Sequence, residues 1–97
     1  MTPSPEPRRR LSLTSAAIRA IEQRLPESVA AAVVEFIHGD LLRDPTRVGK
    51  LLRDENELKG LWSARRGAYR VLYEVDDDRG IVRVVRIDHR RDVYRRL

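Results

Sequence analysis

Arginines cluster in the last third of the chain, beside a histidine and a tyrosine. Arg65, Arg70 and Arg90 come from three separate places, and His89 and Tyr94 lie close to the last of them. A guanidinium fork binds two phosphate oxygens and stays charged at any relevant pH. An imidazole can act as a base or acid near neutral pH, and an aromatic ring among cations can stack on an unpaired base. The combination indicates a surface that binds phosphate and a base, and it favours RNA over a small metabolite.

Each of these residues also has a purely structural explanation. The arginines can form cross-strand ion pairs with Glu74, Asp88 or Asp92. His89 can be a polar residue at the end of a strand, and Tyr94 can pack the chain end onto a sheet. Because three arginines converge, the phosphate site is favoured over ion pairing. For the histidine and the tyrosine both explanations stay open.

The positive charge lies in one half of the chain. Residues 1–45 hold 6 Lys and Arg against 6 Asp and Glu, whereas residues 46–97 hold 14 against 9, which is the whole net charge of +5. A one-sided basic half is typical of a chain with a polyanion partner, and the alternative is a solvated surface balanced by an acidic protein. The candidate RNA-binding cations are Lys50, Arg53, Lys59, Arg66, Arg91 and Arg95. Arg83 and Arg86 belong to the same diffuse field.

Composition excludes several other classes of function. The chain has no cysteine and only His38 and His89, so neither a thiolate nucleophile nor a zinc site is expected, and no cofactor is predicted. No apolar run approaches the roughly 18 residues of a membrane helix. The start of the chain is proline-rich and basic without an apolar core, unlike a secretory signal, so a cytoplasmic location is expected.

At 97 residues the chain is expected to be one small domain, in residues 8–97, after a disordered tail in residues 1–7. Residues 8–14 alternate like a short strand. Apolar residues at helical spacing, Ala17, Ile18, Ile21 and Leu25, predict a helix that ends at Pro26, and a second helix is predicted from Pro26 to about residue 42. The short link predicts an antiparallel helix pair. Residues 45–60 are expected to be a loop.

Three strands are predicted after this loop, at residues 61–66, 68–75 and 81–89, with a turn at 76–80. In the second strand, alternation puts Tyr69, Val71, Tyr73 and Val75 on one face, expected to be the core face, and Arg70 on the other. In the third, it puts the odd-numbered residues 81–89 on one face and the even-numbered residues on the other. The order predicts an α+β fold: an N-terminal strand, an antiparallel helix pair on one face, and a three- to four-stranded antiparallel sheet.

Five segments together resemble the RelE/ParE toxin superfamily, and within it the RelE branch. They are FIHGDL at 36–41, RVGK at 47–50, LWSARRG at 61–67, YRVLY at 69–73 and VRIDHRRDVY at 85–94. The resemblance spans about residues 10–96, and its most specific parts are 63–73 and the ending. It implies a toxin of a type II toxin–antitoxin pair that enters the ribosomal A site and cuts mRNA there, with a small, often acidic, RelB-like antitoxin as its partner.

The resemblance also implies roles for individual residues. Arg70 matches the strand arginine that binds the scissile phosphate, and Arg90 matches the arginine that supports the leaving oxygen. Tyr94 matches the tyrosine that orients the reacting nucleotide, and Arg65 fits the basic residue of the preceding strand. Some RelE toxins carry lysines on that strand, one of them the general base, whereas residues 61–65 contain none. We therefore take His89 as the candidate base.

Two other functions stay open from the sequence. The ParE branch looks similar but inhibits DNA gyrase and is not a nuclease, and the match at Arg70, Arg90 and Tyr94 favours the nuclease. The third possibility is a simple RNA-binding module. It is disfavoured because the sheet carries no repeated aromatic platform outside the expected core face.

Overall fold

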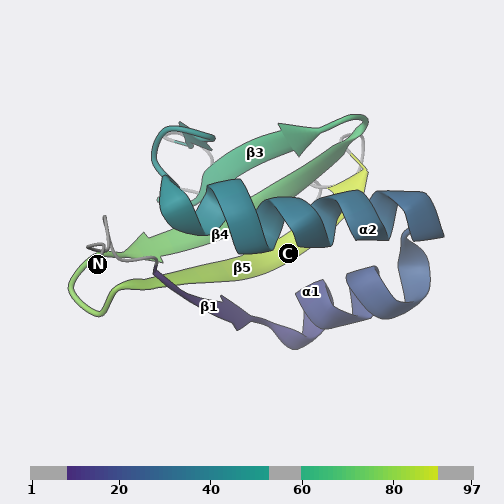
Figure 1. Ribbon diagram of the computed structural model, residues 1–97, viewed down its shortest axis with the longest axis horizontal. Coiled ribbons are helices and arrows are strands. Elements are labelled where there is room, and N and C mark those ends of the chain that lie inside the picture. The colour runs from purple at the N-terminus through teal and green to yellow at the C-terminus, as the bar shows by residue number, and fades with distance from the viewer. Residues whose placement is uncertain (1–8, 53–59, 90–97) are drawn as a thin grey trace, which may run out of the picture.

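The computed structural model describes residues 9–52 and 60–89, which form a five-stranded sheet packed against a helical layer (Figure 1). The strands lie in the order β1-β5-β4-β3-β2. The elements are β1 (Arg10–Leu13), α1 (Ser15–Arg19), the π-helical turn η1 (Ala20–Arg24), α2 (Glu27–Phe36), the π-helical turn η2 (Ile37–Leu41), β2 (Lys50–Leu51), β3 (Trp62–Arg66), β4 (Tyr69–Asp76) and β5 (Ile81–His89).

The two helical segments begin and end where the sequence predicts. The Thr14 hydroxyl accepts a hydrogen bond from the Ala17 amide and so caps α1. Leu25 is extended, as expected before a proline, and Pro26 separates η1 from α2. The segments run antiparallel in Figure 1, with α2 across the sheet and α1 beside β5. The predicted helix pair on one face of the sheet is confirmed.

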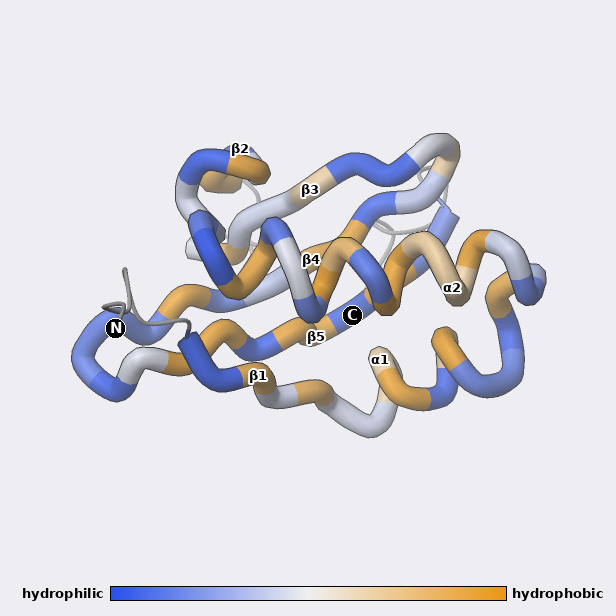
Figure 2. The backbone as a smooth tube through the Cα atoms, viewed as in Figure 1, coloured by the Kyte–Doolittle hydropathy of each residue, from blue (hydrophilic) through white to orange (hydrophobic). Residues whose placement is uncertain are grey.

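The main core lies between the helices and one face of the sheet. Val33, Phe36 and Ile37 from the second helix pack there against Val71 and Tyr73 of β4. Figure 2 shows apolar stretches along α2, β4 and β5, the elements whose buried residues form this core. On the opposite face Leu72 is fully buried in a second, smaller cluster, so β4 is apolar on both sides, as suits the central strand of a sheet.

The predicted face assignment on β5 is wrong beyond its middle. The register shifts opposite Leu72 and Tyr73, where Arg86 and Val84 are the partners and Val85 is the extra residue. A bulge of one residue reverses the alternation of all residues after it. Ile87 therefore joins the core face with Val84, whereas Arg86 and Asp88 turn to the face opposite the helices.

Two other expectations about the sheet need correction. β1 pairs in parallel with β5, so the sheet is mixed and has one strand more than the predicted maximum of four. β2 pairs with β3 inside the segment expected to be a loop. Its two residues are too short for any periodicity to be recognised. The tail predicted at residues 1–7 lies outside the described residues.

Pairing from β1 to β5 ends at Val84, and side chains take over the remaining edge of β5. The Thr14 hydroxyl donates to the Val85 carbonyl at 2.6 Å, and Arg24 Nη2 donates to the Ile87 carbonyl at 3.3 Å. The first helical segment thus replaces a neighbouring strand along the second half of β5. Within the described part of the chain, no helix has the length and apolar character needed to span a bilayer.

A buried hydroxyl fixes the chain between η2 and β2. Tyr73 is fully buried and donates to the Pro45 carbonyl at 2.6 Å, and burial raises the pKa of this phenol well above its usual range. Gly49 lies so close that a Cβ there would overlap the Tyr73 hydroxyl and lie 3.0 Å from the Ser63 carbonyl oxygen. Gly39 in η2 has open space around its Cβ position.

We expect Gly49→Ala to lower the free energy of unfolding by about 1–3 kcal/mol, because the new methyl group must displace a buried hydrogen-bonded side chain. Gly39→Ala is the matched control, and its unfolding free energy should stay equal or rise by up to about 1 kcal/mol. Urea unfolding of both variants checks this. Equal stabilities would show that the Tyr73 contact does not restrict residue 49.

Candidate phosphate-binding site

A tight hairpin brings Arg65 and Arg70 side by side. Gly67 has a φ of 63°, and only Gly67 and Ala68 separate the paired residues Arg66 and Tyr69. Glycine adopts this positive φ without strain, and a two-residue turn fixes the register of the two strands. Arg65 is therefore directly opposite Arg70, and both side chains leave the sheet on the face opposite the helices.

These two arginines differ from most others in the described part of the chain, which are paired with carboxylates. The paired ones are Arg9, Arg24, Arg43, Arg47, Arg79, Arg83 and Arg86. Among the described residues, no carboxylate pairs with Arg65 or Arg70, and Arg70 Nε is buried without a hydrogen-bond partner. Both guanidinium groups thus lack a carboxylate partner in the described part of the chain, and their binding of an anion stays a prediction.

Asp88 of β5 lies directly opposite Arg70, on the side of β4 away from β3. Its carboxylate nevertheless pairs with two other arginines. Oδ1 accepts from Arg24 Nη1 at 2.8 Å, and Oδ2 accepts from Arg86 Nε at 3.0 Å. Burial alone would raise the pKa of Asp88, but the hydrogen bonds and charges of these two arginines outweigh it and hold the pKa below its ordinary value. Asp88 is thus a firmly ionised carboxylate that is already doubly paired.

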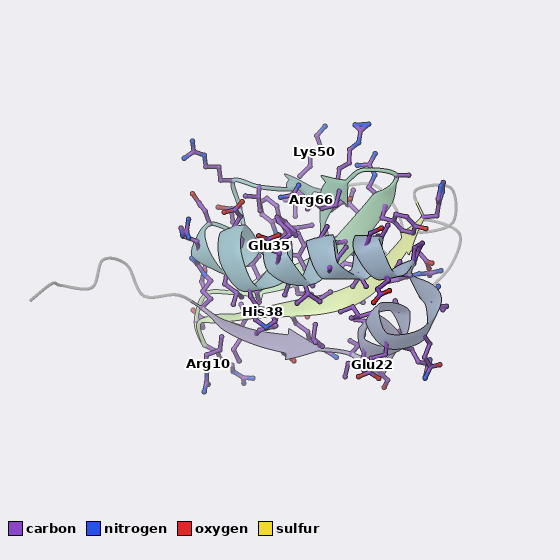
Figure 3. All side chains as sticks on the ribbon, turned by 45° about the vertical axis from the view of Figure 1, so that its right-hand side comes forward. Arg10, Glu22, Glu35, His38, Lys50 and Arg66 are labelled. Atoms are coloured by element: carbon purple, nitrogen blue, oxygen red, sulfur yellow. The ribbon has the colours of Figure 1, made fainter. Side chains whose placement is uncertain are left out.

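The same face continues across the whole sheet. Register places Lys50, Ser63 and Arg86 in one row with the buried Leu72. Arg65 and Arg70 form the next row towards the hairpin turn. Lys50 extends from β2 at the edge of the molecule (Figure 3). This face combines an apolar centre with cations at its turn end and its β2 edge, which is a suitable surface for a nucleotide chain.

The structure does not bring every candidate to that face. His89 is opposite Tyr69 on the helix side, and the two rings meet edge to face with centroids 5.4 Å apart. Arg66 is also on the helix side, with its guanidinium carbon 3.6 Å from the centroid of the Phe36 ring and Nη1 donating to the Arg65 carbonyl. Figure 3 shows Arg66 near Glu35 of α2. His89 nevertheless lies at the same end of the sheet as Arg70, because it directly follows Asp88, the residue opposite Arg70.

The remaining candidates fall outside the described residues. They are Arg53, Lys59, Arg90, Arg91, Tyr94 and Arg95. Within residues 9–52 and 60–89, no three His, Asp or Glu side chains gather in a way that could hold a metal ion.

Comparison with known proteins places the chain in a family. The family model described as the ParE toxin of type II toxin–antitoxin systems matches residues 14–94. The chain belongs to this toxin family. Toxin RelG of Mycobacterium tuberculosis is 58% identical over 73 residues, which cover 75% of this chain and 82% of that toxin. Toxin RelE of the same organism is 51% identical over 85 residues, covering 88% and 84%. The RelE/ParE superfamily predicted from the sequence is confirmed.

Solved structures agree with this assignment. The crystal structure of the toxin–antitoxin complex RelBE2 from M. tuberculosis contains a chain that is 49% identical, with a TM-score of 0.77 over 84% of this chain and 98% of that one. The isolated E. coli RelE toxin is 19% identical, with a TM-score of 0.67 over 84% and 83%. At that identity the likeness to E. coli RelE concerns the fold alone, and it bears out the α+β architecture.

One residue that contacts the site, Arg24, is not identified by the sequence pattern. Arg24 reaches Asp88 across 64 residues of chain. The helical pattern identifies it only as one of several cations near the end of a helix. Its contact depends on the place where β1 leaves β5, which no local signal in the sequence reveals.

The position of Arg65 directly opposite Arg70 predicts an effect on the free energy of unfolding. Like charges directly opposite each other in an antiparallel pair are unfavourable, so Arg65→Thr should raise the free energy of unfolding by about 0.2–1 kcal/mol. Arg83→Thr is the matched control, because Arg83 lies opposite Glu74 with 3.7 Å between Nη1 and Oε1. Urea unfolding should show no gain for the control. A loss of stability in Arg65→Thr would mean that this arginine has a stabilising contact.

Asp88 predicts a pH effect. Its pKa is lower in the folded chain than in the unfolded chain, so its contribution to stability is fully present above the unfolded value of about 3.9 and is lost as pH falls through the folded value. Between about pH 5 and pH 3, the urea midpoint of the wild type should fall more steeply than that of Asp88→Asn. Parallel pH profiles would contradict the role of this carboxylate.

Proposed function

We propose that this toxin is a ribosome-dependent endoribonuclease that cuts mRNA in the A site. The observation that carries the proposal is the opposed pair Arg65 and Arg70, two guanidinium groups without carboxylate partners in the described part of the chain. An unfavourable arrangement of charge is expected where an anionic ligand relieves it. The close relation to RelE and RelG toxins supports the proposal.

In the proposed reaction the ribose 2′-OH attacks the neighbouring phosphorus. The bond to the 5′-oxygen breaks, and the products are a 2′,3′-cyclic phosphate and a 5′-OH. Arg70 binds the non-bridging phosphate oxygens as negative charge builds up on them, and Arg65 adds a second positive charge beside it. No covalent bond to the protein forms, so positioning and charge stabilisation provide most of the rate.

Three further roles rest on the resemblance and on the position of His89. Arg90 supports the leaving 5′-oxygen, and Tyr94 orients the reacting nucleotide. His89 accepts the 2′-OH proton, and solvent water donates a proton to the leaving 5′-oxygen. Since β5 ends at His89 and β4 begins at Tyr69, the nucleotide in this proposal crosses the turn end of the sheet and reaches residues from both faces. The ribosome supplies the rest of the geometry, so free RNA should be cut poorly.

The proposed protein partner is a RelB-like antitoxin. The similar M. tuberculosis chain was solved as a toxin–antitoxin complex, which supports a partner of this kind. The basic second half of the chain favours an acidic partner whose folding onto the site would block access by RNA.

The test uses ribosomes stalled on a defined message in a purified translation system. Wild-type toxin should produce a discrete cut in the A-site codon. Arg70→Ala and Arg90→Ala should each lower the cleavage rate by about 10²- to 10³-fold while antitoxin binding is retained, since each removes one group that stabilises developing charge. Arg79→Ala is the control, because Arg79 lies in the far turn and contacts Asp76. Growth arrest at the wild-type level by the Arg70→Ala/Arg90→Ala double variant would contradict the catalytic assignment.

A ParE-like gyrase inhibitor is the second candidate. The description of the matching family model as a ParE toxin supports it. Intact mRNA and continued translation in the same experiment would favour this candidate, and inhibition of DNA supercoiling would then be measured.

A further inference from the structure

The carboxylate of Asp88 lies in the position where a partner for Arg70 is expected. The two residues are directly opposite each other on β5 and β4 and share the face away from the helices. Side chains in such positions have Cβ atoms about 4.5–5.5 Å apart, and opposite charges there normally attract. Arg70 nevertheless leaves its buried Nε without a partner. Some other interaction must hold the Asp88 carboxylate away from it.

Arg24 provides that interaction from the helical layer. It is the last residue of η1, and its side chain reaches round the free edge of β5. Nη1 donates to Asp88 Oδ1 at 2.8 Å, and Nη2 donates to the Ile87 carbonyl at 3.3 Å. The guanidinium group is thus attached to β5 at two points. The Asp88 side chain is 14% exposed and that of Arg24 is 48% exposed, so water partly screens the contact, and its geometry depends on the two donor–acceptor pairs.

The second carboxylate oxygen is also occupied. Arg86 Nε donates to Asp88 Oδ2 at 3.0 Å from the same strand. Since each oxygen already accepts from a charged donor, the carboxylate has little attraction left for Arg70. Loss of Arg24 would release Oδ1, and Arg70 is the neighbouring cation whose buried Nε lacks a partner.

We propose that Arg24 is a positioning residue: by occupying Asp88 it keeps the Arg70 guanidinium unpaired and available to a phosphate of RNA. Carboxylate and phosphate compete for the same fork of donors, and an aspartate held opposite Arg70 would compete at a very high local concentration. Arg24 removes this intramolecular competitor. The inference rests on the proposed function in one respect only, namely that the anion at Arg70 is an RNA phosphate.

A purely structural role is the alternative. Arg24 and Asp88 would then only fasten η1 to β5, and Arg70 would be indifferent to both. The two roles differ in what Arg70 does when Arg24 is removed and when Asp88 is removed as well. The test therefore compares Arg24→Gln, Asp88→Asn and the double variant, each in the full chain and each checked first for folding by urea unfolding.

The direct readout is the Arg70 Nε–Hε signal in ¹⁵N NMR spectra, assigned by its loss in Arg70→Lys. In Arg24→Gln this signal should shift as Arg70 pairs with Asp88, and in the double variant it should return to its wild-type position. The matched control is Arg9→Gln, which breaks another long-range arginine–aspartate contact, 3.2 Å to Asp77, and removes the same charge. An Arg70 signal that stays in place in Arg24→Gln would overturn the proposal.

The functional readout is binding of a short 2′-O-methyl RNA, which cannot be cleaved. Arg24→Gln should weaken binding by about tenfold more than Arg9→Gln does, and it should lower the salt slope by about one phosphate contact. The double variant should bind within about twofold of the wild type, so that removing Asp88 rescues the loss of Arg24. Losses that simply add in the double variant would indicate the structural role.

These readouts separate this inference from the proposed function. If the wild type cuts no mRNA but the Arg70 signal shifts in Arg24→Gln and returns in the double variant, the positioning role holds and the nuclease proposal fails. If the wild type cuts mRNA in the A site and Arg24→Gln cuts it equally fast with an unmoved Arg70 signal, the positioning role fails alone.

Discussion

The register of β4 between β3 and β5 is the constraint on which the candidate site depends. The turn at Gly67 and Ala68 sets one side of this register, and the bulge at Val85 sets the other. The core enforces both, because a slip by one residue would move Val71 and Tyr73 out of the helical layer and bring Arg70 into it. Burial of apolar surface thus holds two arginines opposite each other, although their own interaction is repulsive.

The repulsion between Arg65 and Arg70 is small compared with what holds the strands together. Like charges in opposite positions cost about 0.2–1 kcal/mol, whereas full burial of one large apolar side chain contributes about 1.5–3 kcal/mol. β4 carries three consecutive buried side chains, Val71, Leu72 and Tyr73. The sheet therefore tolerates the unpaired charges, and an anion bound between them would relieve a strain that the fold already carries.

The sequence predicted those parts of the fold that local signals determine. Periodicity located β5 at its observed bounds, Pro26 separated the helices, and Gly67 lies in the turn between the predicted strands. The parallel pairing of β1 with β5 was not predicted, because it joins segments about 70 residues apart without a local pattern. The bulge at Val85 was missed although the sequence carries a signal for it: Val84 and Val85 are adjacent apolar residues between Arg83 and Arg86, so the alternation of polar and apolar residues changes phase there.

Part of the candidate site was predictable for the same kind of reason. Arg65 and Arg70 flank a turn that the sequence reveals, so their proximity follows from strand alternation. The face of His89 depends on the bulge, and its separation from Arg70 by the sheet follows only once the register of β5 against β4 is known. The contact of Arg24 with Asp88 depends on tertiary structure alone. It requires β1 to leave β5 at Val84 and η1 to approach the vacated edge.

That vacated edge links the two layers of the molecule. Thr14 and Arg24 donate to carbonyls of β5 that a neighbouring strand would otherwise engage. Unpaired strand edges invite pairing with other chains, and side chains on the edge prevent it. The helical layer therefore covers the core, closes the β5 edge and, through Arg24, meets the only carboxylate directly opposite Arg70 in the described sheet. A residue of the helical layer thus pairs with the carboxylate that lies beside Arg70 on the face opposite the helices.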